Sequence, residues 1–343
     1  MESIKEYRDL LILTRKLPRH QQQINNLFEA DCEIVKINSK YYFTATTDSI
    51  GEEISMGLYT DPETWGWMTV ISSVSDLAAS GSSCVGLLVS SQWKFKTPKQ
   101  VQLKTYKGIR EALKTSKTCI LGGDSGFAGD FVLTSTAFGT SSVKPLTRVG
   151  ARPGDWIGII GKKKTGIGPA LAFSYLFSPS DRSKLEKEFR PSPSLQRMST
   201  LRKYCSASID TSDGIATSLN ILGSLNKVGF DLDWREDLIH PLAKKLCRKL
   251  GFHELMLWMG DHGDFQTLVS IPNRHLAKAK KTVRDLVIIG RVTDEIGKTQ
   301  VRFGETQIRL PIELVTRCPR DLESIKKLTL NVAGYFANTG CKN

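Results

Sequence analysis

Aspartates recur along this chain where apolar or β-prone segments end. Four occupy such positions and a fifth follows three residues after the last: Asp31, Asp48, Asp124, Asp210 and Asp213. Strand ends and the turns after them gather at one edge of an α/β sheet, where ligands commonly bind. Carboxylates that converge there repel one another and stay ionised only if cations lie between them. The chain is therefore expected to be an α/β or α+β protein with a cation site at such an edge.

A helix is predicted over 61–81. Asp61 suits its N-cap, Pro62 its first turn and Gly81 its end. Asp76 lies within this helix, beside two serines and away from the apolar stripe. Capping or turn formation would explain each of the other aspartates taken singly, but it does not explain an aspartate in the middle of a helix.

Magnesium is the cation that suits such a cluster. Hard carboxylate oxygens match Mg²⁺, which keeps some water ligands and is shared with substrate phosphates. A short strand is predicted over 118–121, ended by Gly122, Gly123 and Asp124. The two glycines would let a backbone approach a phosphate closely. The aspartate positions alone thus predict a magnesium or phosphate site without specifying which.

The 343 residues suit two domains, which we expect at 1–149 and 150–343 because a turn signal covers 152–155. No stretch approaches the roughly 20 apolar residues of a membrane helix. The acidic N-terminus lacks an apolar region, so no signal peptide is expected. The seven cysteines are scattered without a C-x-x-C pair, which favours reduced thiols and a cytoplasmic location.

The net charge of +13 would attract anions, either nucleic acid, an acidic membrane or a phosphorylated small molecule. Its basic residues are spread along the chain, and no stripe of alternating basic and aromatic residues is visible. We therefore expect a solvated basic surface rather than a nucleic-acid site.

Other familiar sites are not supported. The run at 297–299 has Val292 where a phosphate-binding P-loop needs its first glycine. Residues 123–126 resemble a serine-protease nucleophile turn, but no histidine and aspartate partners can be assigned. His262 lies near two aspartates in sequence, and a lone histidine of this kind is usually structural rather than a metal ligand.

Six segments, in order within roughly residues 28–270, resemble the motif blocks of thiamine-monophosphate kinase, a family of the aminoimidazole ribonucleotide synthetase superfamily. They are TTD at 46–48, SDLAASG at 75–81, GGD at 122–124, LTRVGARPGD at 146–155, RPSP at 190–193 and IDTSDG at 209–214. The resemblance implies a two-domain synthetase-like fold, with N-terminal strands that form a barrel-like core in a homodimer. ATP would lie in a cleft between the domains.

The resemblance also implies roles for individual residues. Magnesium would be bound by Asp31, Asp48, Asp76, Asp210 and Asp213. The ATP-binding residues would be Thr46, Thr47, Gly122, Gly123, Asp124, Arg148 and Ser212, and the catalytic group would be Asp213, Asp124 and Arg148. The acceptor would be a small phosphorylated or otherwise anionic molecule near Ser55, Gly263, Asp264 and Tyr335. Catalysis would consist mainly of positioning and charge neutralisation.

Three positions depart from the family pattern. Ala30 replaces the first aspartate of a pair, Ser55 replaces a histidine, and Gly263 replaces a substrate-contacting glutamate. The metal and ATP residues are thus largely kept, while the acceptor residues change. Three alternatives stay open: a thiamine-monophosphate kinase, a paralogue that phosphorylates another acceptor, and a non-catalytic nucleotide-binding protein.

Overall fold

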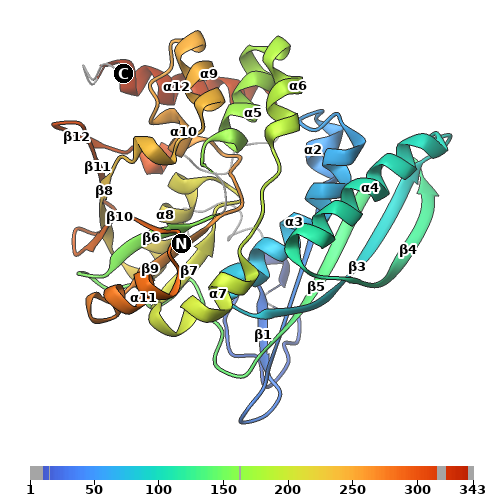
Figure 1. Ribbon diagram of the computed structural model, residues 1–343, viewed down its shortest axis with the longest axis horizontal. Coiled ribbons are helices and arrows are strands. Elements are labelled where there is room, and N and C mark those ends of the chain that lie inside the picture. Colours follow the sequence, from blue (N-terminus) through green and yellow to red (C-terminus); the bar gives the residue numbers. More distant parts are fainter. Residues whose placement is uncertain (1–10, 15, 162–163, 315–321, 339–343) are drawn as a thin grey trace.

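Two β-sheets, built from separate parts of the chain, form the framework of the molecule (Figure 1). The computed structural model describes residues 11–14, 16–161, 164–314 and 322–338. The first sheet, sheet A, has the order β1-β2-β5-β3-β4 and is antiparallel except for the β3–β4 pair. Its strands are β1 (Glu33–Lys36), β2 (Tyr42–Ser49), β3 (Ser83–Lys94), β4 (Ile120–Ala128) and β5 (Val132–Ser141).

The second sheet, sheet B, has the order β12-β11-β8-β10-β6-β9-β7, in which β8 and β11 are parallel and the other neighbours antiparallel. Because most pairs in both sheets are antiparallel, the fold is α+β rather than a parallel α/β sheet. The strands are β6 (Trp156–Ile160), β7 (Ala207–Asp210), β8 (Gly229–Asp233), β9 (Thr267–Ile271), β10 (Leu286–Thr293), β11 (Thr299–Phe303) and β12 (Thr306–Arg309).

Helices flank the sheets at several places. In Figure 1, α5, α6, α9 and α12 gather at one end of the molecule, and α7 and α11 lie near the opposite end of sheet B. The α-helices are α2 (Gly51–Ser55), α3 (Pro62–Ser80), α4 (Lys99–Ser116), α5 (Ile167–Phe177), α6 (Pro179–Glu188), α7 (Leu195–Leu201), α8 (Ile215–Asn226), α9 (Pro241–Leu250), α10 (Met256–Met259), α11 (Leu276–Thr282) and α12 (Leu322–Asn338). The 3₁₀ turns are η1 (Arg202–Tyr204), η2 (Glu236–Leu238), η3 (Asn273–His275) and η4 (Ile312–Leu314).

The helix α3 joins the two sheets. It packs on β2, β3 and β5 of sheet A and also contacts β7 of sheet B. Its predicted ends are confirmed: the Asp61 side chain accepts a hydrogen bond from the Glu63 amide, and Gly81 ends the helix with φ 69°. Ser208 of β7 donates a hydrogen bond of 2.6 Å to the Ala79 carbonyl. The position of Asp76 is therefore set by contacts on both sides.

The glycine motif at 122–124 is not a turn, so the predicted short strand at 118–121 is wrong. The strand β4 runs through the motif, and its parallel pairing with β3 continues from Ser90 opposite Asp124 to the strand end. A Cβ on Gly123 would lie 1.9 Å from the Val89 carbonyl oxygen, so the absence of a side chain there permits close strand contact. Tertiary pairing thus overrides the local turn signal.

Sheet A does not close into a barrel within one chain, because β1 and β4 are its two edges. Between residues 192 and 204, only α7 and the following turn η1 are helical. Within the described ranges, no helix is both long enough and apolar enough to cross a bilayer.

Two glycines let α3 and α4 approach at backbone distance. A Cβ on Gly66 would lie 1.8 Å from the Thr105 carbonyl oxygen, and one on Gly108 would lie 2.1 Å from the Glu63 carbonyl oxygen. Both contacts involve backbone, which moves only if the two helices separate.

We expect Gly66→Ala to destabilise the protein by about 1–3 kcal/mol, because overpacking forces backbone shifts. Urea unfolding followed by circular dichroism measures this change. The matched control is Gly334→Ala, at an exposed position in α12 where a Cβ meets nothing within 4 Å. The control should be neutral or stabilising by up to about 1 kcal/mol. Equal effects of the two substitutions would show that the helix contact is not tightly packed.

Candidate metal and phosphate site

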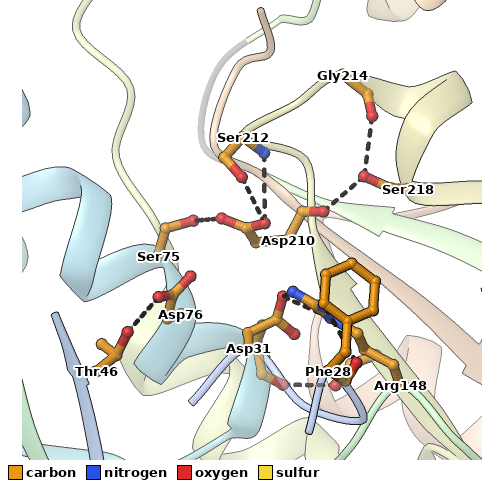
Figure 2. Close-up of polar contacts among 12 residues, drawn as sticks. Phe28, Asp31, Thr46, Ser75, Asp76, Arg148, Asp210, Ser212, Gly214 and Ser218 are labelled. Carbon is orange, nitrogen blue, oxygen red and sulfur yellow. Dashed lines mark hydrogen bonds and ion pairs between the residues drawn. The ribbon is translucent and has the colours of Figure 1, made fainter. Parts of the chain in front are cut away.

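Three buried or half-buried aspartates from distant parts of the sequence meet at one point (Figure 2). Asp31 precedes β1, Asp76 lies in α3 and Asp210 ends β7. One carboxylate oxygen from each lies within 4.8 Å of the others. The segment before sheet A, a strand of sheet B and the helix between the sheets thus each supply one oxygen donor.

Neighbouring hydroxyl groups hold these carboxylates in place. Thr46 donates a hydrogen bond of 2.6 Å to Asp76 Oδ2, and Ser75 donates one of 2.6 Å to Asp210 Oδ2. The Ser212 hydroxyl donates to Asp210 Oδ1 at 2.9 Å. Ser75 and Asp76 are consecutive in α3, so this one turn of helix fixes two of the three carboxylates (Figure 2).

Arg148 is the cation of the site. Its Nη2 and Nε donate to Asp31 Oδ1 at 2.9 and 3.2 Å, and its Nη1 donates to the Phe28 carbonyl at 3.2 Å. The guanidinium also lies over the Phe28 ring, 4.7 Å from its centroid. Phe28 has a left-handed backbone with φ 69°, which large residues adopt rarely outside functional or constrained sites. Arg148 is therefore held at the rim of the aspartate cluster.

A cavity of about 340 Å³ opens over the cluster. The five aspartates predicted to bind metal all line it: Asp31, Asp48, Asp76, Asp210 and Asp213. Ser212 and Arg148 line it as well, and Thr46 reaches it through its bond to Asp76. The sequence pattern thus assembles in space as one constellation.

The pKa values reflect this crowding. Burial raises the pKa of Asp76 well above its ordinary value, and the negative charges of Asp48 and Asp210 raise it further. Burial, together with repulsion from Asp31, raises the pKa of Asp210 to about 7, although hydrogen bonds from serines oppose the shift. Protonation or a bound cation would relieve the repulsion equally well.

Several residues predicted for ATP binding lie elsewhere. Thr47 turns to the other side of β2, where its hydroxyl donates to the Ser135 carbonyl at 3.2 Å. This follows from strand geometry, because Thr46 and Thr47 alternate across the sheet. Gly122, Gly123 and Asp124 are exposed on β4 and do not line the cavity.

The predicted acceptor residues are not gathered at the cavity either. The Ser55 hydroxyl donates to the Glu52 carbonyl at 2.9 Å and is exposed. Asp264 accepts hydrogen bonds from the amides of Gly166 and Gly168 and so caps the start of α5. The Tyr335 hydroxyl donates to the Arg309 carbonyl at 3.0 Å.

Gly263 cannot stand in for a substrate-contacting glutamate. Its amide donates to the Ser212 carbonyl at 2.7 Å, and a Cβ there would lie 1.6 Å from the Thr211 carbonyl oxygen. The backbone at this position is thus packed against the loop that follows β7, and no side chain fits.

Other residues line the same cavity without a clear signal in the sequence. They are acidic, aromatic or apolar and include Glu52, Glu53, Tyr59, Tyr175, Asp261, His262 and Phe265. His262 Nε2 lies 3.2 Å from the Tyr59 hydroxyl, and burial lowers the pKa of His262 to about 4. His262 is therefore neutral near pH 7 and belongs to the cavity wall. The sequence signal for this part of the cavity is limited to two consecutive acids, Glu52 and Glu53, shortly after Asp48.

Comparison with known proteins agrees with this arrangement. The family model described as "AIR synthase related protein, N-terminal domain" matches residues 29–141. Thiamine-monophosphate kinase of Halobacterium salinarum is 27% identical over 251 residues, which cover 72% of this chain and 83% of that protein. The Buchnera aphidicola thiamine-monophosphate kinase is 25% identical over 304 residues, covering 84% of this chain and 92% of its own length.

A solved structure shows the same fold. AaThiL complexed with AMPPCP and TMP superposes with a TM-score of 0.70 at 22% identity, and covers 90% of this chain and 97% of that one. The domain match over residues 29–141, the related kinases and the shared fold together support a place for this chain in the superfamily of thiamine-monophosphate kinase and AIR synthase-like proteins.

Proposed function

We propose that this protein is an ATP- and Mg²⁺-dependent kinase of the thiamine-monophosphate kinase type, which transfers the γ-phosphoryl group of ATP to thiamine phosphate. The observation that carries the proposal is the aspartate cluster: Asp31, Asp76 and Asp210 place oxygens within 4.8 Å of one another inside a cavity. The related kinases, and the neighbouring structure with AMPPCP and TMP, support the same activity.

The donor set fits magnesium. The three clustered ligands are carboxylates, which Mg²⁺ prefers, and the raised pKa values of Asp76 and Asp210 mark a site that favours added positive charge. Asp48 and Asp213 line the same cavity and would complete the site. Bound magnesium would neutralise charge on the phosphates during transfer.

The protein's own groups would orient the reactants. Arg148 would exchange part of its bond to Asp31 for a phosphate oxygen, since a guanidinium can bind two oxygens at once. The phosphate of thiamine phosphate is already a nucleophile, so the reaction needs no general base. Its attacking oxygen would form the new P–O bond while the bond from the γ-phosphorus to ADP breaks.

The other acidic and aromatic residues of the cavity suit the cationic part of this acceptor. Glu52, Glu53 and Asp261 offer carboxylates there, and Tyr59 and Tyr175 offer aromatic surface. Cations are stabilised both by carboxylates and by aromatic faces. Since position 263 has no room for a side chain, the acceptor carboxylate role falls to these residues.

A homodimer in the cytoplasm completes the proposal. The edge of sheet A formed by β3 and β4 exposes large apolar side chains, among them Val85, Leu88, Ile120, Leu121 and Phe127. Apolar patches of this kind on an open sheet are typical of interaction sites. Asp124 lies on the same edge strand, so its proposed role in phosphate binding depends on a second copy of the chain.

We expect Asp76→Asn and Asp213→Asn to lower kcat for ADP formation by at least about 100-fold, because each removes a ligand for the charge-neutralising ion. The assay follows thiamine diphosphate and ADP with ATP, Mg²⁺ and thiamine phosphate. The matched control is Asp130→Asn, which lies outside the cavity. Undiminished turnover in both cavity variants would contradict the metal role.

The same assay separates the alternatives. ADP formation that requires another acceptor would identify a paralogue with changed specificity. Nucleotide binding without turnover on any acceptor would identify a non-catalytic protein.

For the acceptor, Glu53→Gln and Asp261→Asn should each raise KM for thiamine phosphate by about tenfold, since each removes one attraction for the cationic ring. KM for ATP should stay within about twofold, because neither residue is one of the three clustered carboxylates. Steady-state kinetics with each substrate varied in turn measures both constants. Equal increases in the two constants would show that the acceptor is not bound by these residues.

Stability should depend on pH in the absence of metal. Asp210 has a pKa of about 7 in the folded protein and near 4 when unfolded. Its proton-linked stabilisation is therefore complete below the unfolded value and lost as pH rises through about 7. We expect the free energy of unfolding to fall between pH 6 and 8, by at most about 1.4 kcal/mol per pH unit for this one group.

Urea unfolding with EDTA or with Mg²⁺ tests this trend. Magnesium should stabilise the protein more at pH 8 than at pH 6, because protons compete with the ion. In Asp210→Asn the fall with pH should be smaller. A free energy of unfolding that is flat or rises over this range in EDTA would contradict the proposed repulsion.

A further inference from the structure

Aromatic and basic side chains from separate segments meet beside η3, where β6 of sheet B begins. Trp156 of β6 lies opposite Arg291 of β10, and the Arg291 guanidinium stacks on the Trp156 ring, 3.8 Å from its centroid. The Trp156 indole donates a hydrogen bond of 2.9 Å to the Asn273 side chain in η3. Arg291 is exposed, so its planar guanidinium also faces solvent.

A second group of stacked side chains joins η1 to η3. Lys203 Nζ lies over the Tyr204 ring, 5.0 Å from its centroid, and the Tyr204 and His275 rings are 6.0 Å apart in an edge-on arrangement. His275 Nδ1 also lies 3.3 Å from the Tyr204 carbonyl oxygen. A hydrogen bond with Thr282 lowers the pKa of the Tyr204 hydroxyl, and Lys203 and Lys278 add to this shift. An anionic oxygen placed near this hydroxyl would be stabilised in the same way.

We call this surface the α11 face and define it by Trp156, Lys203, Tyr204, His275, Lys278 and Arg291. Asp231 of β8 lies opposite Arg291 in the strand pair, but few other acids are close to this face in sequence. Between residues 273 and 291 the chain has a single acid, Asp285, and that acid forms an ion pair with Arg197. Among the described residues, Lys203, Lys278 and Arg291 form no ion pair.

We propose that the α11 face binds single-stranded nucleic acid. Cations would contact the phosphates, and the Arg291 plane with the Tyr204 and His275 rings would stack on unpaired bases, as single-strand-binding surfaces do. Duplex bases are not accessible for such stacking. A membrane is the less suitable partner, because Trp156 and Tyr204 are half-buried and neither projects an apolar side chain to insert.

This inference departs from the expectation of a merely solvated basic surface. The positions 156, 204, 275 and 291 are too far apart in sequence to form a recognisable stripe, and only the pairing of β6 with β10 and the packing of α11 against η1 and η3 bring them together. The face also lies apart from the aspartate cavity, which α2, α3 and α5 help to line (Figure 1). Binding there is therefore independent of the proposed kinase activity.

The test is fluorescence anisotropy with a labelled oligouridylate of about 20 nucleotides and an oligothymidylate of equal length, since stacking surfaces accept either sugar. The charge variant is Lys203→Gln with Lys278→Gln and Arg291→Gln. It should weaken binding by at least about tenfold at low salt, and reduce the slope of log K against log salt by about 2, as expected for three lost phosphate contacts. Tyr204→Leu keeps the cations and should weaken binding by about fivefold or more.

The matched control removes the same charge from another basic surface: Lys99→Gln, Lys104→Gln and Lys114→Gln on α4. It should change affinity by less than about threefold, because charges on α4 lie far from the α11 face and salt screens their attraction for an oligonucleotide bound there. Circular dichroism and melting temperature verify that every variant is folded.

Several results would overturn the proposal. One is an equal loss of affinity in the α4 control, which would mean diffuse charge attraction. Another is equal affinity for a duplex of the same length, which would exclude base stacking. A third is capture by phosphatidylserine vesicles without binding of either oligonucleotide, which would identify a membrane surface instead.

Discussion

Mutual repulsion among buried carboxylates is the constraint on which the rest of this structure depends. Asp31, Asp76 and Asp210 come within 4.8 Å of one another although like charges at that separation oppose folding. The fold tolerates them because hydroxyl groups donate to two of the carboxylates and Arg148 donates to the third. What remains is an excess of negative charge, which a divalent ion would neutralise while it keeps coordination positions for phosphate oxygens.

The helix α3 makes that convergence possible. It is buried along most of its length between sheet A and β7 of sheet B, so its side chains reach both halves of the molecule. Ser75 and Asp76 use this position, one bonded to Asp210 and the other to Thr46. The close approach of α4 at Gly66 and Gly108 fixes the opposite side of the helix. A small displacement of α3 would therefore separate the carboxylates and weaken the site.

Sequence predictions succeeded where the structure depends on neighbouring residues and failed where it depends on contacts between distant segments. Caps at Asp61 and Gly81 are local, and α3 begins and ends as predicted. The glycines at 122–124 carry a local turn signal, but pairing with β3 draws them into a strand. Gly263 was interpreted as a lost acceptor contact, whereas its contact with the Thr211 carbonyl leaves no space for any side chain. Glu53 and Asp261 line the cavity without any local pattern to announce them.

The sequence by itself determined the chemistry: motif blocks in a fixed order, with aspartates at strand ends and one inside a helix, predict a carboxylate site for a cation and phosphates. Only the tertiary structure decided which side chains share the cavity, because strand alternation sends Thr46 and Thr47 to opposite faces and loop packing brings Asp261 inward. It also decided where charge gathers on the surface, since the α11 face is assembled from residues separated by more than a hundred positions. The sequence specifies the type of each side chain, whereas the meeting of distant side chains at one site depends on strand pairing and packing between segments.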